Sequence, residues 1–577
     1  MSGLLEVNDL SLSINGIEIL KSISFQIQAG QVLGVVGESG SGKSLTAFSI
    51  MQLLPAGSVL SGQILLDGQD IAKYDDAQMC ALRGREIGMA FQEPMTALNP
   101  VQSIGRQVSE VYQKHLKLSK PQALEEAAKI LTRVGLPPSE IPLSRYPFEL
   151  SGGQRQRVVI ALAVALKPKL LIADEPTSAL DVSTEAQVLK LLKTLCDEDN
   201  IALLFISHDL AAIAQLSDTV AVMKEGEIVE QNKAASFFKS MSHSYSIALY
   251  EASQYTAIQH DQQEASPQQQ MPSPIQEEAS PRQEEASPKL IEPLDKTVAP
   301  ILDVKNLSCA YNLPRQFFFS KPNKLLALQD INFHLMPNES LGLVGESGSG
   351  KSTLVRAVLG LKALESGSVW IDGKPFTDTS SAAQKALRKQ IQVVFQDPYG
   401  SFNPRHKISK IVSEPLFLLG SENQRNHDYH QRVSQVLRNV GLSASDADKY
   451  PHEFSGGQRQ RIAIARALVV EPSIVVFDEA TSALDVSVRA QILDLLNDLS
   501  TKLGISYLIV SHDLEVVRVV TDRVLILQQG KIVEQGATSK VFASPSHPYT
   551  KSLLESKPSL QSTVAGKNKD GGEYSNV

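Results

Sequence analysis

The sequence has few cysteines, no long apolar run and no excess of basic residues. Its three cysteines stand far apart and form no Cys-x-x-Cys pair, which argues against a disulfide framework, a zinc ribbon and an iron–sulfur site. The best candidate for a membrane span, residues 158–166, ends at Lys167-Pro168 and has about half the length that a span needs. The formal net charge of −8 argues against a protein that coats nucleic acid.

The N-terminal residues also lack the basic n-region of a signal peptide and run directly into a strand-like pattern. We therefore expect a soluble, cytoplasmic protein that reaches a membrane only through a partner. At 577 residues, the chain is too long for one ordinary domain, so several domains are expected.

The chain repeats itself. Residues 36–44, Val-Gly-Glu-Ser-Gly-Ser-Gly-Lys-Ser, recur at residues 344–352, an offset of 308. Four further segments, which begin at Phe91, Ser151, Thr177 and Ser207, all recur at an offset of 304. An offset that stays constant over more than a hundred residues indicates two copies of one fold with one plan of loops.

A segment of different composition separates the copies. Residues 255–300 are rich in Gln, Glu, Ser and Pro and poor in apolar residues, so they cannot bury enough surface to offset the entropy of ordering. We expect a disordered linker; the alternative is a phosphorylated or partner-binding segment. The predicted organisation is a first domain over residues 1–254, this linker, a second domain over residues 301–558 and a flexible tail over residues 559–577.

Each copy has the pattern of an α/β domain. Short apolar runs lie directly before the repeated motifs, at residues 32–36, 170–173 and 202–206 and again at residues 341–344, 474–477 and 507–510. Helical patterns lie between these runs. The pattern is typical of a mostly parallel sheet that is covered on both faces.

The first repeated motif, Gly37-x-x-x-x-Gly42-Lys43-Ser44, is a P-loop that lies between an apolar run and a helical pattern over residues 45–54. Its glycines let backbone N–H groups turn inward around phosphate oxygens, and the helix directs its positive end at them. We expect Lys43 to contact the β- and γ-phosphates and the Ser44 hydroxyl to bind Mg²⁺. In the second copy these roles fall to Gly345, Gly350, Lys351 and Ser352.

A pair of carboxylates follows a later apolar run in each copy, as Asp174-Glu175 and Asp478-Glu479. The first carboxylate can hold the hydration shell of Mg²⁺, and the second can orient or deprotonate the attacking water. Such a pair is common in solvated loops, but its recurrence after a P-loop in both copies predicts ATP hydrolysis.

The segments Leu-Ser-Gly-Gly-Gln at residues 150–154 and Phe-Ser-Gly-Gly-Gln at residues 454–458 resemble the signature of ABC ATPases. The resemblance implies an α/β fold of two P-loop NTPase ABC ATPase domains, each with a RecA-like core, an antiparallel β subdomain and a helical subdomain. It also implies glutamine-loop residues, switch histidines near the γ-phosphate, a loop that crosses the dimer interface at residues 178–181 and 482–485, and an aromatic residue that stacks on adenine.

In this family two such domains pair head to tail with ATP between them. One site would then combine Lys43 with Ser455, and the other Lys351 with Ser151. Nucleotide would act as a two-state switch, because ATP holds the closed state together and hydrolysis releases it. In the adenine position, Tyr311 aligns with Ile14, so only the second copy offers an aromatic face; the alternative is a tyrosine that merely packs beside Phe317 to Phe319.

Motifs and resemblance together define the predicted sites. Catalysis is assigned to Glu175, Glu479, His208, His512, Gln92 and Gln396. Nucleotide binding is assigned to Gly37, Glu38, Ser39, Gly40, Ser41, Gly42, Lys43, Ser44, Leu45, Ser151, Gly152, Gly153, Gln154, Gly345, Glu346, Ser347, Gly348, Ser349, Gly350, Lys351, Ser352, Thr353, Ser455, Gly456, Gly457, Gln458 and Tyr311. Mg²⁺ is assigned to Ser44, Gln92, Asp174, Ser352, Gln396 and Asp478.

Longer segments are similar to the ATP-binding subunits of bacterial oligopeptide and dipeptide importers. Residues 91–100 resemble the glutamine loop of one such subunit, and residues 395–405 and the insertion at residues 312–324 resemble its companion. Residues 546–554, Ser-His-Pro-Tyr-Thr-Lys-Ser-Leu-Leu, resemble the His-Pro-Tyr segment of these proteins, whereas the first copy has only His-Ser-Tyr at residues 243–245. The chain is thus similar to two importer subunits fused into one.

This resemblance implies ATP and Mg²⁺ as ligands, and as partners two transmembrane permease subunits and a periplasmic or extracellular solute-binding protein. The expected location is the cytoplasmic face of the bacterial membrane, with contact to the membrane only through the permeases and no nucleic acid. The alternatives are the ATPase of an ABC exporter, which the glutamine loops and the His-Pro-Tyr segment disfavour, and a soluble tandem ABC factor acting on ribosomes or nucleic acid, which the acidic linker disfavours. The solute stays open among short peptides, glutathione, nickel chelates, opines and sugars.

Overall fold

The computed structural model describes residues 3–178, 180–253, 299–312, 324–376, 381–397, 400–419, 426–481 and 484–555. Most of the predicted linker and the whole predicted tail, residues 559–577, lie outside these residues, so both stay predictions. Among the residues described, no helix is both long and apolar enough to cross a membrane.

Each half of the chain is built around a six-stranded sheet, with the order β10-β9-β3-β8-β7-β6 in the first half and β20-β19-β13-β18-β17-β16 in the second. The strands are β3 (Val32–Val36), β6 (Ile87–Ala90), β7 (Leu170–Asp174), β8 (Ala202–Ile206), β9 (Thr219–Lys224), β10 (Glu227–Lys233), β13 (Ser340–Val344), β16 (Ile391–Val394), β17 (Ile474–Asp478), β18 (Ser506–Val510), β19 (Arg523–Gln528) and β20 (Lys531–Ala537). β10 and β20 join their sheets antiparallel through tight hairpins, and the other neighbours are parallel. The equal strand order confirms the predicted α/β fold and its duplication.

The central strands are buried on both faces, which explains their uninterrupted apolar runs. Successive side chains of a strand point to opposite faces, and in β3 this places Leu33 and Val35 in one core and Val32 and Val36 in another. The first of these cores lies between the central sheet, α1 (Lys43–Met51) and a second, antiparallel sheet.

The antiparallel sheets have the orders β2-β1-β4-β5 and β12-β11-β14-β15. Their strands are β1 (Leu5–Ile14), β2 (Ile17–Ile27), β4 (Ser58–Leu66), β5 (Gln69–Asp70), β11 (Leu302–Asn312), β12 (Lys324–Leu335), β14 (Ser366–Ile371) and β15 (Lys374–Pro375). In the two hairpins Ile14 pairs with Ile17, and Tyr311 pairs with Leu325. This equivalent register supports the alignment of Ile14 with Tyr311.

A helical layer covers the other face of each central sheet. In the first half it contains α4 (Ile104–Leu116), α5 (Lys120–Arg133) and α6 (Gly152–Val164), and in the second α13 (Ile408–Ser413), the 3₁₀ helix η3 (Glu414–Leu419), α14 (Asn426–Asn439) and α15 (Gly456–Leu468). The long helix α4 has become a short helix and a 3₁₀ turn in the second half. Pro415 stands where α4 has Val111, and a proline removes a backbone donor and obstructs the preceding turn of an α-helix.

Further helices are α2 (Asp76–Leu82), α3 (Pro94–Ala97), α7 (Val182–Asp199), α8 (Leu210–Leu216), α9 (Ala234–Phe237), α11 (Lys351–Val358), α12 (Ser381–Gln390), α16 (Val486–Leu503), α17 (Leu514–Val520), α18 (Thr538–Ala543) and α19 (Pro548–Glu555), with 3₁₀ turns η1 (Ile71–Lys73), η2 (Pro147–Glu149), η5 (Ala444–Asp448) and η6 (Pro451–Glu453). Residues 244–253 are also helical. Helix α1 begins two residues before the predicted span and ends three residues before its end, because Gln52 caps it in the left-handed region with a φ of 48°.

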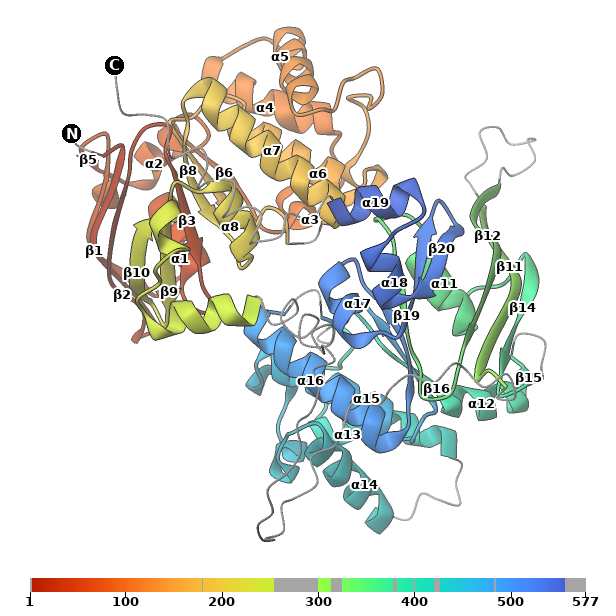
Figure 1. Ribbon diagram of the computed structural model, residues 1–577. Coiled ribbons are helices and arrows are strands. Elements are labelled where there is room, and N and C mark those ends of the chain that lie inside the picture. Colours follow the sequence, from red (N-terminus) through yellow and green to blue (C-terminus); the bar gives the residue numbers. More distant parts are fainter. Residues whose placement is uncertain are drawn as a thin grey trace, which may run out of the picture.

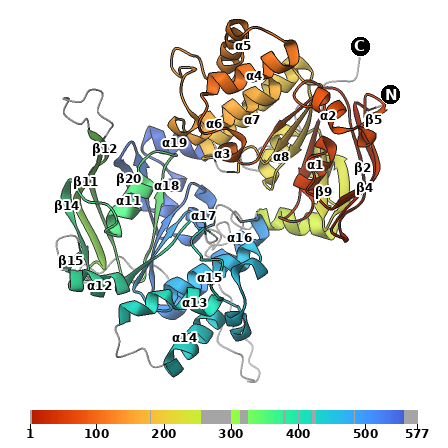
Figure 2. The same ribbon diagram turned by 180° about the vertical axis from the view of Figure 1, so that it is seen from behind.

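The two halves lie side by side and point in opposite directions (Figure 1). The antiparallel sheets form the two outer ends of the molecule, and the helical layers α4–α5 and α13–α14 lie at opposite edges; the view from behind shows the same arrangement (Figure 2).

Candidate nucleotide sites

Each P-loop turns between the central strand and the helix that follows it, β3 and α1 in the first half and β13 and α11 in the second. Gly42 and Gly350 have φ values of 102° and 113°, in the left-handed region that favours glycine. A Cβ atom at Gly42 would lie 2.5 Å from Leu20 Cδ2. Both the backbone angle and the close packing therefore require glycine at this turn.

The P-loop lysines are buried, with exposed fractions of 5% for Lys43 and 6% for Lys351. Lys43 Nζ donates to the carbonyl oxygens of Gly37 and Glu38 at 2.8 Å each. Lys351 Nζ makes the equivalent bonds at 2.7 and 3.0 Å. Burial lowers the pKa of both lysines, and the carboxylates of the Asp-Glu pairs oppose this effect. Each ammonium group is thus held inside its loop, where a phosphate would enter.

The residues of the P-loop fit a phosphate and a hard cation. Among the residues described, the buried hydroxyls of Ser41 and Ser349 have no hydrogen-bond partner, so they are free to donate to a ligand. Ser44 Oγ donates to Asp174 Oδ1 at 3.0 Å, which brings together two oxygen ligands of the kind that Mg²⁺ prefers. Burial raises the pKa of Asp174 to about 6 and also raises that of Asp478.

The second carboxylate of each pair meets the predicted switch histidine. His208 Nδ1 lies 3.3 Å from Glu175 Oε2, and His512 Nδ1 lies 3.3 Å from Glu479 Oε2. Burial raises the pKa of each glutamate, but the hydrogen bond from its histidine and the charges nearby outweigh burial and lower the pKa. Both carboxylates are therefore kept ionised, as a base that orients water requires.

The glutamine loops differ between the halves. Gln92 Nε2 donates to Glu175 Oε2 at 2.8 Å, so the first glutamine touches the predicted catalytic carboxylate. Gln396 instead lines a cavity of about 890 Å³ together with Ser352 and Asp478. The structure thus places the second glutamine beside the predicted metal ligands.

Both glutamates have an unusual backbone. Glu175 has a φ of 44° and Glu479 a φ of 50°. Such angles cost free energy in residues other than glycine, and they cluster at functional sites, where the surrounding structure maintains them. The N–H groups of these residues donate to Ile206 and Val510 across the sheet at 2.9 Å. The sheet therefore holds both carboxylates at its carboxyl edge, in an orientation that the local sequence alone would not favour.

Each signature segment forms the N-terminus of a helix in the helical layer. Ser151 caps α6: its Oγ accepts from Gln154 N at 3.2 Å, and Gln154 Oε1 accepts from Ser151 N at 3.0 Å. Ser455 and Gln458 cap α15 in the same way. A helix start exposes N–H groups and the positive end of the helix dipole, so each signature can attract an anion.

Each P-loop is contacted by the other half of the chain. Asp485 Oδ1 accepts from both N and Oγ of Ser39 at 3.0 Å, and Asp181 Oδ2 accepts from Ser347 N at 3.4 Å. These aspartates are the last residues of the predicted interface-crossing loops at residues 178–181 and 482–485. The halves are therefore docked head to tail through their P-loops.

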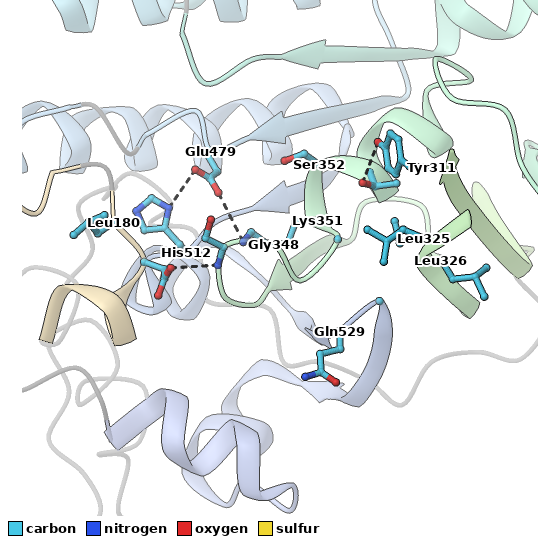
Figure 3. A pocket seen from close by; sticks show the side chains of 16 residues that line it. Leu180, Tyr311, Leu325, Leu326, Gly348, Lys351, Ser352, Glu479, His512 and Gln529 are labelled. Carbon is cyan, nitrogen blue, oxygen red and sulfur yellow. Dashed lines mark hydrogen bonds and ion pairs between the residues drawn. The ribbon is translucent and has the colours of Figure 1, made fainter. Parts of the chain in front are cut away.

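A cavity of about 500 Å³ opens at the second P-loop (Figure 3). Its lining residues are Leu180 and Asp181 of the first half and Tyr311, Leu325, Leu326, Ala327, Ser347, Gly348, Gly350, Lys351, Ser352, Thr353, Glu479, His512, Gln529 and Gly530 of the second. Figure 3 shows Tyr311 with Leu325 and Leu326 on one side of the loop and Glu479 with His512 on the other. Ser151 is not among the described residues that line it, so its pairing with Lys351 stays a prediction.

Sequence reasoning missed several contacts at these sites. Lys362 Nζ lies 3.9 Å from the centroid of the Tyr311 ring, and Tyr245 and Tyr549 accept hydrogen bonds from the P-loop backbone. The tyrosines are separated by the same offset of 304 residues as the other repeated motifs, and that offset could have identified them. No local pattern marks Lys362.

Comparison with known proteins gives matches that cover most of the chain. The family model described as ABC transporter matches residues 20–178 and 328–482, and the model described as oligopeptide/dipeptide transporter, C-terminal region, matches residues 533–575. The glutathione import ATP-binding protein GsiA of Salmonella choleraesuis is 41% identical over 549 residues, which cover 94% of this chain and 87% of that protein.

GsiA of Escherichia coli (strain K12) is 42% identical over 564 residues, with the same coverage. A solved dimeric structure of the ATP-binding cassette MJ0796 in a post-hydrolysis state, bound to ADP and Pi, is 28% identical and covers 41% of this chain and 98% of that chain, with a TM-score of 0.37. From its family matches and relatives, the chain belongs to the ABC transporter family, as an ATP-binding and ATP-hydrolysing importer subunit that carries both cassettes in one polypeptide.

Proposed function

We propose that this ATPase energises the uptake of glutathione or other short peptides. The observation that supports this most is the identity of 41–42% across both cassettes to proteins named for glutathione import. The match of residues 533–575 to the C-terminal region of oligopeptide and dipeptide transporters supports the same class of solute.

Each cassette is proposed to hydrolyse ATP with its own Asp-Glu pair and P-loop. Lys43 and Lys351 bind the β- and γ-phosphates, and the signature of the opposite cassette completes each site. Glu175 and Glu479 orient and deprotonate the attacking water, because their histidine partners keep them ionised. Gln92 and His208 position the carboxylate of Glu175 and the γ-phosphate. In the second cassette His512 positions Glu479, and Gln396 acts beside the metal ligands.

Mg²⁺ is proposed to bind where Ser44 and Asp174 meet, and at Ser352 and Asp478 in the second cassette, with the glutamine-loop residues beside it. When bound, the ion supplies positive charge to the phosphate oxygens. The hydrogen bond between Ser44 and Asp174 supports this proposal, because it brings their two oxygen atoms close together.

The proposed partners are two transmembrane permease subunits and a solute-binding protein outside the membrane, with this chain at the cytoplasmic face. Nucleic acid is not among the proposed partners. The two cassettes pair with each other, so one chain would serve both permease subunits.

Uptake in whole cells tests the proposal. Cells that lack the gene are complemented with the wild-type chain, with Lys43→Ala/Lys351→Ala, or with the surface control Lys193→Ala, whose ammonium group pairs only with a neighbouring carboxylate on α7 among the described residues. We expect labelled glutathione and a labelled dipeptide to accumulate in cells with the wild-type and control chains but not with the double variant.

Competition with unlabelled solutes then ranks the substrate class. Accumulation of nickel alone would contradict the peptide assignment, and loss of solute from preloaded cells in an ATP-dependent manner would indicate an exporter.

A further inference from the structure

The segment after the last sheet hairpin of the second cassette is tied down by one carboxylate. Glu534 on β20 accepts from Ser546 N at 2.8 Å, from Ser546 Oγ at 2.7 Å and from His547 N at 3.1 Å. Tyr549 N in turn donates to His547 Nδ1 at 3.2 Å. Three of these four bonds join a side chain to backbone, so the position of Tyr549 relative to β20 is defined.

The first cassette forms the same set of hydrogen bonds, although its sequence lacks the proline of the His-Pro-Tyr segment. Glu230 on β10 accepts from Ser242 N at 2.9 Å, from Ser242 Oγ at 3.0 Å and from His243 N at 3.1 Å, and Tyr245 N donates to His243 Nδ1 at 3.1 Å. The C-terminal family model matches only residues 533–575, and Ser244 stands where the second cassette has Pro548. The proline is therefore not needed for this geometry, whereas the glutamate, serine, histidine and tyrosine occur in both.

Both tyrosines end on the P-loop of their own cassette. The N–H of Glu38 donates to Tyr245 Oη at 3.1 Å, and the N–H of Glu346 donates to Tyr549 Oη at 3.0 Å. These N–H groups belong to the residue after the first P-loop glycine. The carbonyl of the same residue accepts from the P-loop lysine.

The contact also adjoins the surface where the cassettes meet. Ser39, the residue after Glu38, is the one that donates to Asp485 of the opposite cassette. Ser347, after Glu346, donates to Asp181. Two consecutive residues of each P-loop are thus fixed from two directions, one by the tyrosine of the same cassette and one by the aspartate of the other.

We infer that Tyr245 and Tyr549 are positioning residues of the two ATP sites, whose hydroxyl groups hold the P-loop in the shape that receives phosphate. The inference concerns nucleotide binding and does not depend on which solute is carried. Each hydroxyl bonds to the backbone of the loop, so it acts on the site through the loop.

Removal of one hydroxyl removes this hydrogen bond to the loop backbone and lets the loop move. Because the loop contacts the nucleotide in the ground state and in the transition state alike, the loss weakens binding uniformly, which raises KM and leaves kcat unchanged. The loss of one such hydrogen bond corresponds to about a 2- to 10-fold change.

The test compares Tyr245→Phe, Tyr549→Phe and the double variant with Tyr507→Phe in the full-length chain bound to its permeases. Tyr507 is the matched control, because its buried Oη also bonds to backbone, to Leu496 O at 3.2 Å, but within the core. We expect the KM for MgATP to rise about 2- to 10-fold in each test variant, with kcat unchanged, and expect Tyr507→Phe to lower the melting temperature without a change in KM.

Two further variants test the same inference if the Tyr→Phe variants do not fold. Glu230→Gln and Glu534→Gln keep the tyrosine but loosen the segment that carries it, so they should also raise KM. The inference is overturned if both Tyr→Phe variants retain the wild-type KM, if Tyr507→Phe raises KM to the same degree, or, where the Tyr→Phe variants do not fold, if both Glu→Gln variants bind MgATP as the wild type does.

Discussion

At the scale of single residues, the two cassettes have equivalent predicted catalytic carboxylates and differ at the predicted adenine position. Glu175 and Glu479 have the same backbone angle, within a few degrees, and the same distance to their histidines. Nothing in the geometry of this pair marks either cassette as inactive. We therefore expect both sites to hydrolyse ATP.

Replacement of either glutamate tests this equality. Glu175→Gln and Glu479→Gln should each slow hydrolysis at the altered site by about 10²-fold, because an amide cannot accept the proton of water, and should favour the ATP-bound closed state. ATPase rates of the two single variants and the double variant in the permease-bound complex provide the measurement, with the exposed Glu251→Gln as control. If one single variant kept the wild-type rate, equal competence of the two sites would be wrong.

The adenine position predicts unequal affinity. Tyr311 lines the cavity at the second P-loop and offers an aromatic ring. The equivalent residue of the first cassette, Ile14, offers only aliphatic surface. Base stacking contributes about 1–3 kcal/mol, so the Lys351 site should bind ATP roughly 5- to 100-fold more tightly than the Lys43 site if stacking is the main difference. Lys362 lies over one face of the Tyr311 ring. Adenine would therefore stack on the opposite face, or Lys362 would move away when adenine binds.

Titration of the full-length chain with a fluorescent ATP analogue should resolve two affinities. Ile14→Tyr should tighten the weaker site and Tyr311→Ala should weaken the tighter one, while Tyr311→Phe, which keeps the ring and loses only the hydroxyl near Thr353 Oγ1, should change little. Two equal affinities that no substitution moves would show that Ile14 and Tyr311 do not contact adenine.

At the scale of elements, the hairpin β19–β20 and the helix α19 are joined by a carboxylate. Burial raises the pKa of Glu534, but the hydrogen bonds donated to it, among them those from Ser546 and His547, outweigh burial and lower the pKa from 4.5 to about 2. A carboxylate whose pKa is lowered by folding stabilises the native state above its unfolded pKa, and this stability is lost as the pH falls through the folded pKa.

Glu534→Gln should therefore destabilise the protein at neutral pH and matter less in acid. We expect the melting temperature to fall by about 2–4 °C at pH 7, because the neutral amide forms weaker hydrogen bonds than the carboxylate. The difference from the wild type should shrink as the pH falls from about 4.5 toward 2. A difference that is constant over this range would mean that the charge of Glu534 does not stabilise the segment.

At the scale of the whole molecule, two aspartates join the cassettes and differ in what else they do. Asp485 accepts two hydrogen bonds from Ser39 and has no capping bond to its own helix α16. Asp181 accepts one longer bond from Ser347 and also caps α7 through Thr184 N at 3.1 Å. The first is mainly an interface residue, and the second combines an interface contact with a helix cap.

Because of this difference, substitution of the two aspartates should distinguish an effect on docking of the cassettes from an effect on the stability of the fold. Asp485→Ala should lower the ATPase rate several-fold through weaker docking of the first P-loop, with a melting temperature close to that of the wild type. Asp181→Ala should lower both, since loss of a helix cap costs about 1 kcal/mol. Calorimetry and ATPase assays on the two variants provide the comparison, and equal melting temperatures would contradict the assigned division of roles.

The sequence by itself determined the fold class and the duplication, and it predicted the catalytic residues. The six apolar runs before the motifs became β3, β7, β8, β13, β17 and β18 within one residue at each end, because burial on both faces leaves a continuous apolar signal. The P-loop and the capping boxes of Ser151 and Ser455 were predictable for a related reason. Their hydrogen bonds and backbone angles are satisfied within a few residues of chain.

Only the tertiary structure decided which residues from distant parts of the chain meet. Ser39 and Asp485 are 446 residues apart, and Glu38 and Tyr245 are 207 residues apart; neither pair has a local pattern that predicts its partner. The placement of Lys362 over Tyr311 likewise depends on packing. Short-range geometry follows from residue type and spacing, whereas contacts between cassettes follow from how two complete domains dock.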